Sequence, residues 1–131
     1  MPARKQLLLG APIGCGVDVV DLPRFTRVLL RGGAAFRRRV FTPRELAYAK
    51  NRPRTELLHL AGRFAAKEAV IKAISQLAPG REPAMRDVEI KNDRYGRPSI
   101  TLHGNRRGRY HIYVSLSHVK SVAVASAIVT R

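Results

Sequence analysis

The chain has 131 residues, 45% of them hydrophobic, which suits a single compact domain over residues 1–131. Lysine and arginine number 25 against nine acidic residues, and this formal net charge of +16 favours a polyanion or an acidic protein as partner. No apolar stretch approaches the roughly 20 residues of a membrane-spanning helix, and the single cysteine, Cys15, excludes an internal disulfide and fits a reducing compartment.

A strand is the first element that the pattern predicts. Residues 13–20 form an apolar run with two glycines inside it, which indicates a strand that ends near Asp18. Cys15 lies between those glycines and is expected to be a small buried residue rather than a nucleophile. Apolar residues at helical spacing then predict a helix over 22–30, which the glycine pair at 32–33 should end.

Two further helices follow in the middle of the chain. Thr42, Pro43 and Glu45 fit a capping box with proline at the first helical position, so a helix is expected from there to about Lys50. A long helix is predicted over 55–77, where a Pro-Gly pair stops it.

The last third of the sequence changes to strand patterns. Residues 88–91 and 98–102 flank a turn and predict a hairpin, and further strands are expected over 110–116 and 122–129, with His118 in the connection between them. The predicted fold class is therefore α+β, a single small domain with an antiparallel sheet packed against helices.

Glu68 and Lys72 lie one turn apart on the predicted long helix. Glutamate four residues before lysine is the favoured orientation of a helix salt bridge, which is worth only about 0.2–0.5 kcal/mol. The pair is therefore either a surface ion pair or part of an active site, and its spacing alone favours the ion pair.

Two further residues, Asp18 and His118, bear on whether this pair belongs to an active site. Asp18 comes where a glycine-rich strand should end, and its carboxylate together with Glu68 could hold Mg²⁺, which typically binds one or two carboxylates, water and substrate phosphates. Lys72 would then be a point charge for the same phosphates. His118 follows a predicted strand, where a capping and a functional role are equally compatible with the sequence.

The arginines form a second pattern on the sequence. From composition alone, nucleic-acid binding is the first interpretation, but no known nucleic-acid-binding signature is present. A basic face on the first helix could instead bind an acidic protein. The alternative is that this face is only solvated. The residues of this predicted face are Arg24, Arg27, Arg31, Arg37, Arg38 and Arg39.

Five segments in order together resemble the holo-acyl-carrier-protein synthase family, the short type of 4′-phosphopantetheinyl transferase. The resemblance covers nearly the whole chain, and the Gly-x-Asp start and the RFAAKEAxxKA helix are its most specific parts. The segments are GCGVDVVDLPRF (14–25), RVFTPREL (39–46), LAGRFAAKEAVIKA (60–73), DVEIKNDRYGRPSI (87–100) and VSLSHVKSVAVASAIV (114–129).

This resemblance implies a specific reaction and specific roles. Family members transfer the phosphopantetheine arm of coenzyme A to a serine hydroxyl of apo-acyl carrier protein with Mg²⁺, and adenosine 3′,5′-bisphosphate leaves. Asp18 and Glu68 match the metal ligands and Lys72 the lysine near the pyrophosphate. Arg63 and His118 match positions near coenzyme A phosphates, so Glu68, Lys72 and His118 are the expected catalytic residues.

The resemblance also implies an assembly and a docking face. The family typically forms a homotrimer with each site between two subunits, so Asp18 and His118 need not meet within one chain. The basic face falls where the family binds its acidic carrier protein. Either Glu68 or a metal-bound water could accept the serine proton.

Two basic features lie outside the family's motifs, namely the arginine cluster over 32–39 and the loop over 104–109. Together with a start that carries no acidic residue before Asp18, this basicity favours a mitochondrial matrix protein acting on mitochondrial acyl carrier protein. A bacterial cytoplasmic protein is the alternative.

Overall fold

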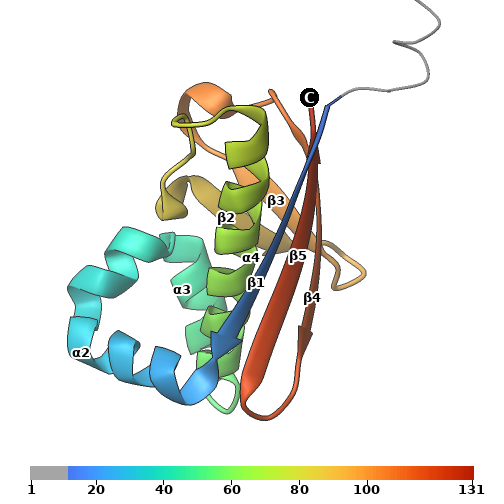
Figure 1. The fold of residues 1–131 in the computed structure, drawn as a ribbon. Helices are drawn as coiled ribbons and strands as arrows, with labels where there is room; N and C mark the ends of the chain where they lie inside the picture. Colours follow the sequence, from blue (N-terminus) through green and yellow to red (C-terminus); the bar gives the residue numbers. More distant parts are fainter. Residues whose placement is uncertain (1–11) are drawn as a thin grey trace, which may run out of the picture.

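The structure, a computed structural model, describes residues 12–131. Its main layer is a three-stranded antiparallel sheet in the order β1 (Ile13–Asp21), β5 (Val122–Thr130) and β4 (His111–His118). The long helix α4 (Glu56–Leu77) crosses one face of this sheet (Figure 1). The predicted α+β class, with an antiparallel sheet against helices, is confirmed.

The central strand β5 decides how closely α4 can approach the sheet. Ala123, Ala125, Ala127 and Val129 alternate along β5 and are buried, because period-two spacing sends them all to the helix side. Three of these four residues are alanines, so the helix axis can lie close to the strand.

Strand β1 approaches α4 even more closely, and two glycines allow it. A Cβ atom added at Gly14 would collide with the backbone carbonyl of Ala73, and one at Gly16 would collide with that of Ala69. Since both obstacles are helix backbone that cannot move aside, no larger residue fits at these positions without shifting β1 off α4. The position of Asp18, two residues after Gly16, follows from this contact.

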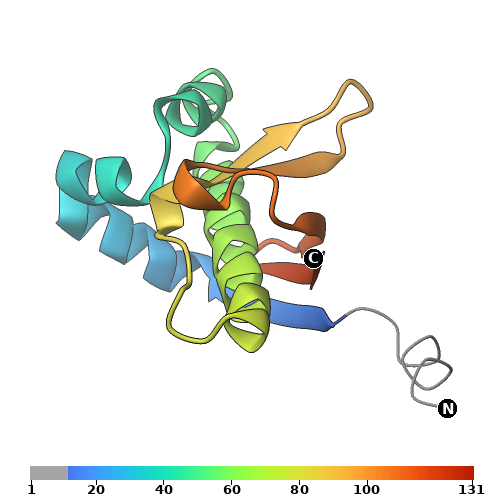
Figure 2. The same ribbon diagram turned by 90° about the horizontal axis from the view of Figure 1, so that it is seen from above.

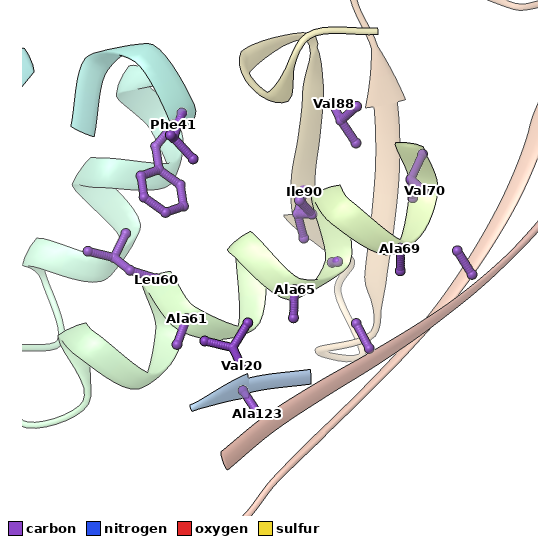
Figure 3. Close-up of a cluster of buried hydrophobic side chains, with 14 of the residues drawn as sticks. Val20, Phe41, Leu60, Ala61, Ala65, Ala69, Val70, Val88, Ile90 and Ala123 are labelled. Atoms are coloured by element: carbon purple, nitrogen blue, oxygen red, sulfur yellow. The ribbon is translucent and has the colours of Figure 1, made fainter. Parts of the chain in front are cut away.

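A two-stranded hairpin lies on the other side of α4. β2 (Val88–Asn92) and β3 (Pro98–Leu102) pair in antiparallel fashion, as predicted, and the turn between them is held by Asp93. Figure 3 shows α4 between the apolar side chains of β2 and those of β1 and β5. One single-turn 3₁₀ helix (Met85–Asp87) precedes β2 and another (Gly104–Arg106) follows β3.

The remaining helices, α2 (Leu22–Val40) and α3 (Pro43–Lys50), form an arm beside α4 (Figure 2). The capping box at the start of α3 is confirmed, with the backbone N–H of Thr42 donating to Glu45 Oε1 at 2.9 Å. The prediction that the glycine pair ends the first helix is confirmed, because Gly33, with φ 57° and ψ −150°, is not helical and separates two helices within α2. The second of these helices, which continues to Val40, was not predicted; apolar Phe36 and Val40 pack it on the core.

Two further expectations are corrected by the structure. His118 is the last residue of β4 rather than part of the connection to β5, since it still pairs with Ala123. Cys15 is exposed, not buried, because it points to the face of β1 opposite α4. The basic residues of α2 lie at the surface as expected, apart from Arg37, which is half-buried beside Glu56.

A buried ion pair joins α3, α4 and the segment before β2. Lys67 Nζ lies 2.8 Å from Glu45 Oε1, and both side chains are fully buried. Lys67 also donates to the carbonyls of Met85 and Val88, and Glu45 Oε2 accepts from the N–H of Ile90. Protein groups thus compensate both charges.

Within residues 12–131, no helix combines the length and the apolar composition that a bilayer-spanning segment requires.

Candidate active site

The structure brings Asp18 and Glu68 to one pocket of about 360 Å³ between β1, α2 and α4. Asp18 lies near the end of β1, where the close packing on α4 places its carboxylate beside the helix, and its side chain is 16% exposed. Arg24 of α2 and the rings of Phe25 and Phe64 also line this carboxylate pocket. A strand residue and a helix residue that are distant in sequence therefore line one pocket, as a shared metal site requires.

Lys72 belongs to the same site but pairs differently from the expected helix salt bridge. Its Nζ lies 3.0 Å from Asp18 Oδ1 and donates to the carbonyl of Val17 at 3.0 Å. In residues 12–131 no ion pair joins Lys72 to Glu68. The reading of the two helix residues as a simple surface salt bridge is therefore wrong, and Lys72 instead bridges helix and strand.

Glu68 is left without a cationic partner of its own in the described part of the chain, and its electrostatics reflect this. Burial raises the pKa of Glu68 above its ordinary value, the negative charge of Asp18 raises it further, and Lys72 only partly opposes this. Two carboxylates that repel each other in one pocket are a favourable place for a cation.

The donor set fits Mg²⁺ better than a softer metal. Over residues 12–131, no group of three or more His, Cys, Asp or Glu side chains could enclose a metal ion. Magnesium commonly binds only one or two carboxylates and completes its octahedron with water and substrate phosphates. Asp18 and Glu68 supply that number of hard oxygen ligands.

A second pocket, of about 210 Å³, lies between α4, β4 and the hairpin and contains Arg63 and His118. We call it the histidine pocket, because His59 also lines it. Arg63 is only 5% exposed; its Nη2 donates to Asn92 Oδ1 at 2.9 Å, and its guanidinium lies 4.1 Å from the centre of the Tyr48 ring. Its Nε atom is buried without a hydrogen-bond partner.

Basic groups dominate this region, and some were missed on the sequence. A neighbouring hollow of about 520 Å³ shares His118 and adds Arg54 and Lys120. His59, which the sequence did not single out, has its pKa lowered by burial and then by the positive charges of Arg63, Arg52 and His118. An apolar neighbourhood with only positive charges is suited to bind an anion.

The structure does not bring all predicted site residues together. Asp18, Glu68 and Lys72 form one group, while Arg63 and His118 line the histidine pocket, and the carboxylate pocket and histidine pocket share no residue. The predicted docking arginines are nearer to the first group, since Arg24 lines the carboxylate pocket itself.

Comparison with known proteins identifies the family. The family model of the 4′-phosphopantetheinyl transferase superfamily matches residues 14–127. The holo-[acyl-carrier-protein] synthase of Geobacillus kaustophilus is 40% identical over 120 residues, which cover 91% of this chain and 89% of that protein. That of Syntrophus aciditrophicus is 36% identical over 121 residues, covering 88% and 93%.

Solved structures agree with this match. The fold is similar to that of a Chronobacterium ammoniagenes ACPS-CoA complex, with a TM-score of 0.78 and 34% identity over 91% of this chain and 97% of that one. A holo-(acyl-carrier-protein) synthase from Bacillus anthracis in complex with CoA (3′,5′-ADP) gives a TM-score of 0.72 and 32% identity, covering 89% and 95%.

The relatives also correct the expected compartment. Geobacillus and Syntrophus are bacteria, which have no mitochondria, so the prediction of a mitochondrial matrix protein is wrong. The high positive charge and the acid-free start were misleading because charge alone does not specify a compartment. The extent of the family match and the level of identity show that the chain belongs to the 4′-phosphopantetheinyl transferase superfamily, as a member of the holo-[acyl-carrier-protein] synthase family.

Proposed function

We propose that the protein transfers the 4′-phosphopantetheine arm of coenzyme A to a serine hydroxyl of apo-acyl carrier protein. The observation that carries the proposal is the carboxylate pocket, in which Asp18 and Glu68 meet and Lys72 contacts Asp18, in a chain that aligns with holo-[acyl-carrier-protein] synthases. In this reaction the serine oxygen bonds to the β-phosphorus of coenzyme A, and the bond from that phosphorus to the oxygen of the departing adenosine 3′,5′-bisphosphate breaks.

The roles of the pocket residues follow from their environment. Asp18 and Glu68 would hold Mg²⁺, and Lys72, which contacts the Asp18 carboxylate, would place its ammonium near the phosphates of coenzyme A. When bound, Mg²⁺ supplies positive charge that stabilises the charge developing on the phosphoryl oxygens. Glu68, whose pKa is raised by burial, is also suited to accept the serine proton, since a base works best near the operating pH.

The histidine pocket would bind the phosphates of coenzyme A. Arg63 offers a guanidinium held by Asn92 and Tyr48, with one buried N–H still without an acceptor, and His118 lies at the exposed end of β4. Because the carboxylate and histidine pockets are separate in one chain, we propose that each active site combines the carboxylate pocket of one subunit with the histidine pocket of another.

A homotrimer would also cover an apolar surface. The face of the β1–β5–β4 sheet opposite α4 exposes large apolar side chains from all three strands, each at least half exposed. Exposed apolar patches of this kind commonly mark protein–protein interfaces. The residues are Ile13, Val17, Val19, Tyr113 and Ile128.

The first experiment measures the intact mass of an apo-acyl carrier protein after incubation with this protein, coenzyme A and Mg²⁺. The carrier should gain one phosphopantetheine arm, and EDTA should abolish the gain. Glu68→Gln should lower the rate by at least about a hundredfold, the usual scale for loss of one acid–base or electrostatic group.

The matched control for this experiment is Glu82→Gln, which removes a carboxylate outside both pockets and should keep the wild-type rate. If several apo-carrier proteins gain no mass from a folded enzyme, the proposal fails. Salt-dependent, Mg²⁺-independent binding to RNA or DNA would then indicate that the net charge of +16 serves nucleic-acid binding.

A further inference from the structure

A third pocket, of about 420 Å³, lies where the last turn of α4, the loop after β3 and the end of β5 meet, at the end of the molecule marked C in Figure 1. It contains the basic loop over 104–109 that the reaction does not use. Four arginines line it and, among the described residues, no Asp or Glu side chain does, and we call it the arginine pocket. Its polar and aromatic lining residues are Arg81, Asn105, Arg106, Arg109, Tyr110 and Arg131.

The positive charge of the arginine pocket is not neutralised by the protein. Over residues 12–131, none of its four arginines lies within 4 Å of a carboxylate oxygen. The residues before position 12 include no Asp or Glu that could supply one. The carboxylate of neighbouring Glu82 accepts instead from the N–H of Gly80. Four like charges around one hollow repel one another, and a bound anion would relieve this repulsion.

Two of the four guanidinium groups are held in place by the backbone. Arg106 donates from Nε to the carbonyl of Arg81 at 2.9 Å and from Nη2 to that of Glu82 at 3.2 Å. Arg131 donates from Nη2 to the carbonyl of Leu77 at the end of α4, at 2.6 Å. Because these contacts fix the side chains before any ligand arrives, less conformational entropy is lost on binding.

Arg106 and Arg131 have a structural role in binding backbone carbonyls, but within residues 12–131 Arg81 and Arg109 make no such contacts. In the described part of the chain, the side chains of Arg81 and Arg109 donate no hydrogen bond to protein. All five N–H groups of each guanidinium are therefore available to a ligand.

We propose that the arginine pocket binds a small anion that carries a diphosphate group. The guanidinium fork matches pairs of phosphate oxygens, and four positive charges are best complemented by an anion with three or four negative charges. A hollow of about 420 Å³ is in the usual size range of small-molecule sites, and it gathers four arginines, three of them exposed, around one space. No lining residue is shared with the carboxylate or histidine pocket, so substitutions in the arginine pocket leave every residue proposed for the transfer reaction in place.

The test is a calorimetric titration of the full-length protein with inorganic pyrophosphate at constant ionic strength in EDTA. The double variant Arg81→Gln/Arg109→Gln should lose one pyrophosphate site per chain, or bind there at least about tenfold more weakly. The matched control Arg86→Gln/Arg107→Gln removes the same charge from exposed positions outside the arginine pocket, one of them in the same loop, and should bind as the wild type does.

The outcomes separate the alternatives. Equal pyrophosphate binding by the two double variants would overturn the proposal, because it would place all binding in the other pockets or in diffuse charge. Inorganic phosphate that binds this site as tightly as pyrophosphate would overturn the assignment to a diphosphate. The Arg81→Gln/Arg109→Gln variant should still modify apo-carrier protein, and a specific loss of carrier-protein affinity with intact pyrophosphate binding would make the pocket a protein contact instead.

Discussion

His59 is a single residue whose ionisation would report on anion binding in the histidine pocket. Its pKa lies below the ordinary 6.5, first because of burial and then because Arg63, Arg52 and His118 are positive. The free protein therefore keeps this imidazole neutral at pH values where an exposed histidine begins to take up a proton. A phosphate placed among these cations would offset them and raise the pKa again.

We therefore expect coenzyme A binding to take up a proton below pH 6.5 and to tighten as the pH falls through that region. Calorimetry at pH 6 in two buffers with different protonation enthalpies measures the uptake. The 3′-phosphate of coenzyme A also titrates in this pH range. The control is therefore the same titration with His59→Gln, in which the part of the proton uptake that is due to the imidazole should be absent. Identical uptake by both proteins would contradict an anion beside His59.

Arg63, which we propose binds a phosphate of coenzyme A, also depends on the surrounding structure for its position. It is held by Asn92 from the hairpin and by the ring of Tyr48 from α3, so three elements must be in place before its guanidinium faces the histidine pocket. Sequence spacing placed Arg63 on α4 correctly, but its burial depends on elements that come before and after the helix. A residue of this kind is predicted by family resemblance and explained only by the fold.

At the scale of elements, the buried pair Lys67–Glu45 fastens α4 to α3. Removing one member leaves the other as an uncompensated buried charge, whereas the intact pair is fully hydrogen-bonded. We expect Lys67→Met to lower the free energy of unfolding by about 3–5 kcal/mol, measured by urea denaturation. Lys50→Met, at an exposed lysine of α3, is the control and should change stability little.

A double variant distinguishes charge from packing at this pair. Glu45→Gln/Lys67→Met leaves no unpaired charge, so its loss of stability should be smaller than the sum of the two single losses. Strict additivity would show that the two side chains act independently and that shape, not charge, accounts for the effect.

Helix α2 is the element proposed to bind the carrier protein. Arg27 and Arg31 are exposed on it, and Arg24 connects the same face to the carboxylate pocket. Arg27→Glu should raise the KM for an acidic carrier protein about tenfold and leave the KM for coenzyme A unchanged, because Arg27 lines neither the carboxylate nor the histidine pocket. Arg86→Glu reverses an exposed charge elsewhere, and an equal effect there would mean that only net charge matters.

Local signals made most elements predictable from the sequence. The capping box at Thr42, the turn before Pro98 and the apolar spacing of α4 each depend on neighbours within a few residues, and all three are confirmed. The short helix after Gly33 was missed because it depends on tertiary packing of Phe36 and Val40 rather than on a local apolar pattern. Lys67 was missed because its partner Glu45 lies on another helix, which no periodicity reveals.

The candidate site was predictable only in part for the same reason. The resemblance named Asp18, Glu68 and Lys72, but whether strand and helix meet depends on the pairing of β1 with β5 and on the missing side chains at Gly14 and Gly16. These are contacts between distant parts of the chain. The separation of His118 from Asp18 is likewise a property of the whole molecule.

At that largest scale, an active site shared between subunits predicts complementation. Glu68→Gln damages only the carboxylate pocket, and His118→Ala damages only the histidine pocket. When the two inactive proteins are co-expressed, random trimers should contain intact sites at about a quarter of the interfaces, with activity to match. Activity no higher than that of the separate variants would instead place the whole site within one chain.

The order of strands in the sheet also has a consequence for biosynthesis. Among the described strands, β1 is translated first, yet its partner in the sheet is β5, which is translated last of the five. β1 therefore lacks its sheet partner until β5 has been synthesised, although α4, on which Gly14 and Gly16 pack, is made earlier. Long-range pairing of this kind slows folding and prolongs exposure to aggregation, so we expect added chaperones to raise the yield of folded protein.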